Sequence, residues 1–467
     1  MAVKVVGKDM DELLLASAKS LADAIRKKEV SSVEVVDAYI KRIEEVNPCL
    51  NAVVQLTAEK AHAQAREMDA SVMRGDIKGP LHGVPMTIKD SFDTCGVIST
   101  GGTKGREGYV PERDATVVAR MRAAGAILLG KTNTPELTLA FETDNLVYGR
   151  TNNPYDPSRT PGGSSGGAAA IIAAGGTPID IGSDMAGSIR LPAHFCGISG
   201  IKPTSGRVPR TGHIIPFGMG ALDSLTQIGP MARFVEDLIT VLPVICGVDY
   251  KDPSIIPMPV GCPEKINIKD LSVAVHTDNG RVLPKLEISE AVKAAATALE
   301  DAGACVEEDR PAILGTNINI MTADCGWIRR LLKEAGTEEI HPWLNLYFDN
   351  EKQTSSFEFM QIMEKWDIFR SEMLSFMESY DVIICPVNIS PAIPHGTWLN
   401  KENRRGFSYT MTYNLTGWPA AVARAGTSPD GLPIGVQIVG LPWREDVVLA
   451  VAGHIETALG GYKPPPI

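Results

Sequence analysis

The chain has 467 residues, of which 44% are hydrophobic and 22% charged, with 44 Gly and 32 Pro; this is typical of a globular enzyme and excludes a repeat or disordered protein. A formal net charge of -11, with no dense basic cluster, excludes a nucleic-acid partner. Residues 1–12 lack a secretory signal and no apolar run reaches the roughly 18 to 20 residues of a membrane helix, so we expect a cytoplasmic protein with no membrane partner.

Helices and strands alternate along the chain. Ser31 and Glu34 form a capping box ahead of a one-sided apolar pattern, which predicts a helix over about residues 32–46. An apolar segment bounded by Gly and Pro, residues 83–90, predicts a buried strand that delivers Lys89 at its end. Further strands are predicted over 126–129, 178–183, 271–276, 381–385 and 434–440, and further helices over 168–174, over 289–302 and from Asp446 onward.

This alternation predicts an α/β fold in which one sheet is covered by helices on both faces. Residues 143–161 form a polar, turn-rich connection, and residues 246–269 are expected to form a surface loop because Pro and Gly recur there without a period. The eight Cys and eight His are dispersed, without C-x-x-C or H-x-x-x-H pairs. We therefore expect reduced, mostly buried thiols, no metal and no cofactor.

Two serine-containing turns are candidates for chemistry. Residues 162–167 (GGSSGG) satisfy G-x-S-x-G around Ser164 or Ser165, as a nucleophile elbow would. The preceding residues 151–161 carry three prolines and no apolar strand, so a glycine turn whose serines cap a helix remains the alternative. Ser188 follows a predicted strand and two small residues, which allow consecutive backbone N–H groups to form an oxyanion hole.

A serine hydroxyl needs a base, and no His-centred arrangement stands out in the sequence. Lys89, at the end of an apolar strand, is a physically reasonable base if burial keeps its amine neutral. Lowering its pKa from about 10.4 to about 7 takes roughly 4 to 5 kcal/mol, which desolvation can supply. The alternative is an ion pair at the surface between Lys89 and Asp90 or another carboxylate.

Three motifs in this order, followed by GIKPT, resemble the amidase signature family: GVPMTIKD at 83–90, PGGSSGG at 161–167 and GSDMAGSIRLPA at 182–193. The resemblance runs over nearly the whole chain. It implies a single amidase signature domain over residues 1–467, with a large mixed, twisted β-sheet covered by helices on both faces. The core motifs would span 83–206, and a more variable region over 247–400 would shape substrate access.

The resemblance also implies roles for individual residues. Ser188 would be the nucleophile, Lys89 the terminal base and Ser164 the serine that relays a proton between them, after a cis peptide at Gly163. Asp184 and Arg190 are interpreted as structural partners on either side of the nucleophile. The remaining implied residues are the oxyanion-hole N–H groups of Met185, Ala186, Gly187 and Ser188, the supporting Ser165, and the substrate-pocket residues Thr138 and Phe141; Ala186 stands where the family more often has Gly.

The implied function is a serine hydrolase that cleaves C–N bonds of amides or carbamates (urethanes) through an acyl-enzyme, as a monomer or homodimer. Aryl acylamidases and bacterial urethanases of the family are similar in layout. The aromatic residues Trp327, Trp343, Tyr347, Phe348 and Phe357 suggest an apolar access route for an apolar or aryl substrate, or are simply core. The first alternative is the glutamine-hydrolysing A subunit of a tRNA-dependent amidotransferase, which needs a partner protein; the second is a binding protein without turnover.

Overall fold

The computed structural model describes residues 10–316, 318, 320, 326–349 and 353–467. Within them, an eight-stranded sheet runs in the order β4-β6-β5-β10-β11-β9-β7-β8. Pairing is antiparallel from β4 to β9 and parallel between β9, β7 and β8, so the predicted large mixed sheet is confirmed. The strands are β4 (Ile179–Asp184), β5 (Ser199–Lys202), β6 (Gln227–Ala232), β7 (Ser272–Val275), β8 (Cys305–Glu308), β9 (Val382–Pro386), β10 (Ala420–Thr427) and β11 (Pro433–Gly440).

Helices cover both faces of this sheet, as predicted. Successive side chains of a strand point to opposite faces, and in β10 Ala421 and Ala423 enter one hydrophobic core while Val422 enters another. The first core lies under α8, α9 and α15, and the second under α6 and α7. These helices are α6 (Gly166–Ala173), α7 (Arg190–Cys196), α8 (Val235–Ile245), α9 (Leu286–Asp301) and α15 (Glu445–Leu459).

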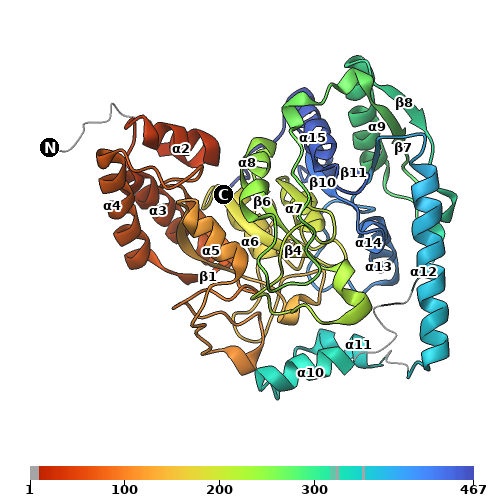
Figure 1. Ribbon diagram of the computed structural model, residues 1–467, viewed down its shortest axis with the longest axis horizontal. Helices are drawn as coiled ribbons and strands as arrows, with labels where there is room; N and C mark the ends of the chain where they lie inside the picture. The colour runs from red at the N-terminus through yellow and green to blue at the C-terminus, as the bar shows by residue number, and fades with distance from the viewer. Residues whose placement is uncertain (1–9, 317, 319, 321–325, 350–352) are drawn as a thin grey trace.

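A second, three-stranded sheet of order β1-β3-β2 lies against the large one, with β2 beside β4. Its strands are β1 (Val53–Leu56), β2 (Pro85–Lys89) and β3 (Ile127–Thr132). The helices next to it in the chain are α2 (Ala18–Arg26), α3 (Ser32–Leu50), α4 (Ala58–Arg74) and α5 (Thr116–Ala123). Figure 1 shows α2–α4 at one end of the molecule and α12 (Ser356–Phe376) at the other. The contact between β2 and β4 matters because both strands lead to predicted site residues.

The predicted elements are recovered closely. The capping box of Ser31 and Glu34 is present, and α3 continues beyond residue 46 to Leu50. The predicted surface loop over 246–269 holds only two short 3-10 turns, η4 (Pro263–Lys265) and η5 (Ile268–Asp270). Strand β10 escaped prediction because its sequence, AAVARAGT, is rich in Ala rather than in β-branched residues; its place between β5 and β11 decides its conformation.

Two expectations about side chains and segments can also be checked. No described cysteine forms a disulfide, but only Cys196 and Cys385 are buried, so the expectation of mostly buried thiols is wrong. Cys325 lies outside the described residues. In the part of the chain that the structure describes, no helix combines the length and the apolar character needed to cross a bilayer.

Candidate active site

Lys89 ends strand β2 and is completely buried. Its Nζ donates hydrogen bonds to Ser164 Oγ at 2.7 Å, to Ser165 Oγ at 3.0 Å and to Ser183 Oγ at 3.0 Å. The surface ion pair with Asp90 is therefore ruled out. Ser183 was not predicted; it precedes the motif's Asp184 on β4 and reaches Lys89 only because β2 packs beside β4.

The protonation of Lys89 follows from this environment. Burial lowers the pKa of Lys89 to about 7, while the carboxylates of Asp184 and Asp180 act in the opposite direction. A large fraction of the amine is therefore neutral near pH 7. A neutral amine can accept a proton from a hydroxyl, which an ammonium cannot do.

The turn that carries Ser164 is held by the loop at residues 140–143. The Gly163–Ser164 peptide is cis, as the family resemblance implied. A side chain at Gly163 would meet the Glu142 backbone N at 2.6 Å and the Ala140 carbonyl O at 2.7 Å, so only glycine fits there. Thr143 Oγ1 donates to the Gly162 carbonyl at 2.9 Å and accepts from the Gly166 N–H at 3.2 Å, where α6 begins.

The turn that carries Ser188 connects β4 to α7, and Ser188 is 6% exposed. Gly187 has a φ of 126°, and an added Cβ would collide with Thr410 on α14 (Ser408–Leu415). Thr410 Oγ1 in turn donates to the Ala186 carbonyl at 2.7 Å. Thr410, which lies far along the chain, therefore supports the turn; sequence analysis had no signal for it.

The backbone N–H groups of this turn are not equivalent. Asp184 Oδ1 accepts the Gly187 N–H at 2.7 Å, so that donor already has a partner. Within the described part of the chain, no acceptor takes the N–H of Met185, Ala186 or Ser188. Of the four predicted oxyanion-hole donors, only Gly187 thus has an acceptor among the described residues.

Ser164 and Ser188 lie in neighbouring turns. The Ser165 N–H donates to the Ser188 carbonyl at 3.1 Å, which joins the two segments. No hydrogen bond links the two hydroxyl oxygens among the described residues. Catalytic hydrogen bonds are often long without substrate and shorten when it binds, so the Ser164–Ser188 step of the relay remains part of the proposal below.

Arg190 and Asp184 form a fully buried ion pair at 2.9 Å. Burial acts to raise the pKa of Asp184, but the Arg190 guanidinium holds it well below its usual range. Arg190 also donates to the Thr410 carbonyl at 2.9 Å, to Gln437 Oε1 at 2.6 Å and to Asn414 Oδ1. The guanidinium therefore connects the Ser188 turn to α14 and β11, which is what we expect of a structural partner.

Aromatic side chains gather at the loop that supports Ser164. The Phe141 ring stacks on Phe407 with centroids 3.8 Å apart and meets Trp398 edge-on at 6.0 Å. Trp343 packs edge-on against Trp398 at 5.7 Å. We call Phe141, Phe407, Trp398 and Trp343 the aromatic cluster. Thr138, the other predicted pocket residue, ends a 3-10 turn, η2 (Glu136–Thr138), just before this loop and has a φ of 60°.

Of the five aromatic residues expected along the access route, two join the aromatic cluster or hydrogen-bond to this loop. Trp343 belongs to the aromatic cluster, and the Tyr347 hydroxyl donates to the Leu139 carbonyl at 3.2 Å. Phe348 lies under the Arg329 guanidinium instead. Trp327 is buried in the hydrophobic core that also contains Leu139 and Met185, whereas Phe357 is 71% exposed on α12.

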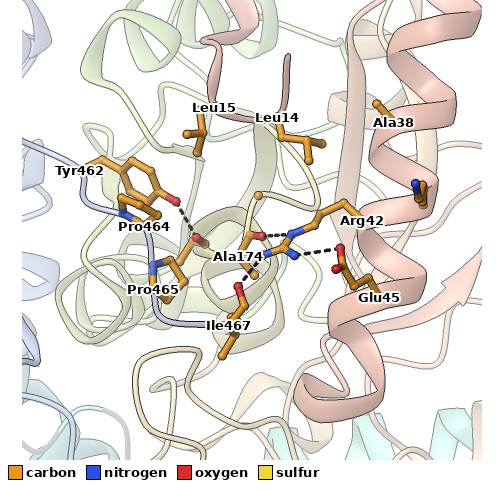
Figure 2. Close-up of a pocket in the computed structure, with 13 residues that line it drawn as sticks. Leu14, Leu15, Ala38, Arg42, Glu45, Ala174, Tyr462, Pro464, Pro465 and Ile467 are labelled. Atoms are coloured by element: carbon orange, nitrogen blue, oxygen red, sulfur yellow. Dashed lines mark hydrogen bonds and ion pairs between the residues drawn. The ribbon is translucent and has the colours of Figure 1, made fainter. Parts of the chain in front are cut away.

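A pocket of about 570 Å³ lies away from these residues, between α3, the end of α6 and the C-terminal segment (Figure 2). Arg42 donates there to the carbonyls of Ala174 and Ile467, and Tyr462 to that of Ala173. These polar groups hydrogen-bond to other segments of the chain. Nowhere in the described ranges do three His, Cys, Asp or Glu side chains meet in a way that could hold a metal ion.

The chain belongs to the amidase signature family: the Amidase family matches over residues 34–449. The A subunit of the glutamyl-tRNA(Gln) amidotransferase from Heliobacterium modesticaldum is 33% identical, covering 97% of this chain and 99% of the relative. The same subunit from other bacteria recurs among the relatives. The family defines an enzyme that acts on C–N bonds.

Solved structures of amide hydrolases share the fold. 6-Aminohexanoate cyclic dimer hydrolase in complex with substrate is 30% identical, with a TM-score of 0.84 over 96% of this chain and 97% of that one. A bacterial aryl acylamidase of the amidase signature family is 26% identical, with a TM-score of 0.82 over 95% and 96% of the two chains. These similarities confirm the predicted family and fold.

Proposed function

We propose that the protein hydrolyses the C–N bond of a small amide or carbamate through an acyl-enzyme on Ser188, with Ser164 and Lys89 as its proton relay. The observation that carries the proposal is the buried Lys89 amine, 2.7 Å from Ser164 Oγ and with a pKa lowered to about 7. Ser188, the most exposed of the three at 6%, is placed to meet the substrate.

In the proposed mechanism Ser188 Oγ attacks the carbonyl carbon as its proton passes to Ser164 Oγ, whose own proton passes to Lys89 Nζ. The new C–O bond places negative charge on the carbonyl oxygen, which the N–H groups of Met185, Ala186 and Ser188 stabilise. When the C–N bond breaks, the proton returns from Lys89 through Ser164 to the leaving nitrogen. Water then cleaves the acyl-enzyme by the same route.

An apolar or aryl substrate fits the surroundings of the site. The aromatic cluster borders the loop that supports Ser164, and Trp343 and Tyr347 bring the variable region over 247–400 to this loop. Two acidic side chains near the site already have partners: Asp184 pairs with Arg190, and Glu142 with His395 at 2.8 Å. We propose a stand-alone enzyme, monomeric or homodimeric, in which this region shapes substrate access.

The second candidate is the glutamine-hydrolysing A subunit of a tRNA-dependent amidotransferase. It is favoured by the relatives, among which that subunit recurs. The chemistry at Ser188 would be the same, with glutamine as the amide and a partner protein as the site of transfer.

An activity screen tests both candidates. The purified chain is assayed on an anilide, a fatty amide, an aryl carbamate and glutamine, with Ser188→Ala as control. Turnover of the apolar substrates by the sole chain supports the first candidate, and glutaminase activity that needs a co-purified partner supports the second. Hydrolysis that survives in Ser188→Ala contradicts the proposed nucleophile, and failure of a fluorophosphonate probe to label Ser188 would favour a binding protein.

A further inference from the structure

Asp180 is a buried carboxylate that the mechanism above does not use. It lies on β4 and is completely shielded from solvent. Its Oδ2 accepts hydrogen bonds from Thr87 Oγ1 at 2.6 Å and from Thr132 Oγ1 at 3.0 Å. Oδ1 makes no hydrogen bond within the usual distance and angle limits, although the backbone N–H of Lys89 faces the carboxylate. Asp180 thus connects β4 to both β2 and β3.

The neighbouring carboxylates each face a cation. Asp184 pairs with Arg190 at 2.9 Å, and Asp90 lies 3.9 Å from Lys131 Nζ. Among the described residues no cationic group lies within 4.0 Å of Asp180, and no carboxylate lies within 4.0 Å of Lys89 Nζ. Asp180 and Lys89 therefore both lack a close counter-ion, and they act on one another through a low-dielectric interior.

The titratable groups around Lys89 come from several elements. Asp180 and Asp184 lie on β4. Lys131 lies on β3, and Asp90 directly follows β2. His213 faces Lys89 from a loop. Burial raises the pKa of Asp180 to about 7, the range to which burial lowers that of Lys89. Because the two groups face one another in the interior, a negative Asp180 favours the protonated form of Lys89.

We infer that Asp180 is a positioning residue for Lys89: its carboxylate adds to that of Asp184 in favouring the protonated amine, and the hydrogen bond that it accepts from Thr87 holds the end of β2 against β4. This inference rests on the proposed function of Lys89 as the base. Removing the negative charge while keeping the shape, as in Asp180→Asn, makes Lys89 lose its proton at lower pH.

The test is the rate at which a fluorophosphonate probe labels Ser188, measured against pH, because this readout requires no knowledge of the substrate. In Asp180→Asn the acidic limb of the profile is expected to move to lower pH by about one unit. Asp237→Asn is the matched control: Asp237 is an equally buried carboxylate on α8, its pKa is also raised to about 7 by burial, and it is not among the groups facing Lys89. The control is expected to leave the limb in place.

A folded Asp180→Asn protein whose acidic limb stays at the wild-type pH overturns the inference. If that variant does not fold, Thr87→Val replaces it, since loss of one hydrogen bond to the carboxylate disfavours the negative Asp180; a smaller shift in the same direction supports the inference and no shift overturns it. Lys89→Met distinguishes a failure of the proposed function from a failure of the inference about Asp180. If its labelling rate and pH profile equal those of the wild type, the proposed base is wrong, whereas a large loss in Lys89→Met with an unmoved limb in Asp180→Asn refutes only the role of Asp180.

Discussion

Two lysines on neighbouring strands of the small sheet, Lys89 on β2 and Lys131 on β3, are both completely buried. Burial lowers the pKa of Lys89 to about 7 and that of Lys131 to about 8. Their partners differ. Lys131 Nζ donates to the Phe92 carbonyl as well as to two hydroxyls, and lies 3.9 Å from Asp90, whereas all three partners of Lys89 are hydroxyls.

The different partners fit a structural role for Lys131 and the proposed chemical role for Lys89. A carbonyl oxygen only accepts hydrogen bonds, so it favours a protonated Lys131, and the nearby carboxylate favours the same form. A hydroxyl both donates and accepts, so the partners of Lys89 suit the ammonium and the neutral amine equally. Burial alone therefore does not make a base; the partners must also tolerate the loss of the proton.

The largest expected effect is that of Lys89→Met on amide hydrolysis. Without the relay's base, the amide rate is expected to fall by about 10⁴-fold. Ester hydrolysis should fall much less, because an ester leaving group depends less on protonation. The measurement is kcat/KM on an amide and an ester with the same acyl group, and equal losses on both would speak against a lysine-driven relay. Lys131→Met, the matched control, should keep the amide-to-ester ratio of the wild type.

The next effect is that of Lys131→Met on stability. The substitution leaves the buried Asp90 without its nearby cation, which is expected to cost about 3 to 5 kcal/mol in the free energy of unfolding. Chemical denaturation of the wild type and the variant measures this cost. A variant as stable as the wild type would show that Lys131 does not serve the fold.

The pH dependence of activity also distinguishes the two lysines, with a smaller expected effect. Because only the neutral Lys89 amine accepts a proton, activity should rise as pH increases through about 7, the pKa of Lys89. Below that value, kcat/KM is expected to fall about tenfold per pH unit. Lys131→Met should show the same acidic limb. If the limb disappears in this variant, Lys131 rather than Lys89 is the base.

The smallest effects concern one serine neighbour of each lysine. Ser183→Ala removes one of three hydroxyl partners of Lys89 and is expected to lower kcat/KM by about tenfold with little change in stability. Ser99→Ala removes a partner of Lys131 and should instead lower the free energy of unfolding by about 1 kcal/mol with activity retained. The reverse pattern would show that the hydroxyls around Lys89 serve only packing.

Much of the fold follows from local patterns. The capping box at Ser31, the apolar strand that ends at Lys89 and the apolar runs of β9 and β11 all lie where the sequence indicates. The family motifs also point to Lys89 and Ser164, which the structure brings together at 2.7 Å. In contrast, Ser183, Asp180 and Thr410 carry no local signal, because their importance comes from contacts with distant segments.

By itself, the sequence indicated many of the local elements and the order of the motifs, since these depend on residue type and short spacing. The family resemblance of those motifs pointed to the three side chains proposed for the chemistry. Only the tertiary structure decided which of the two buried lysines of the small sheet has partners that suit a neutral amine, and that Gly187 gives its N–H to Asp184. It also decided that Trp343 packs beside Phe141 and Trp398 while Phe357 lies exposed on α12. The physical reason is that desolvation and hydrogen bonding depend on which distant residues the packed sheets and helices bring within a few ångströms.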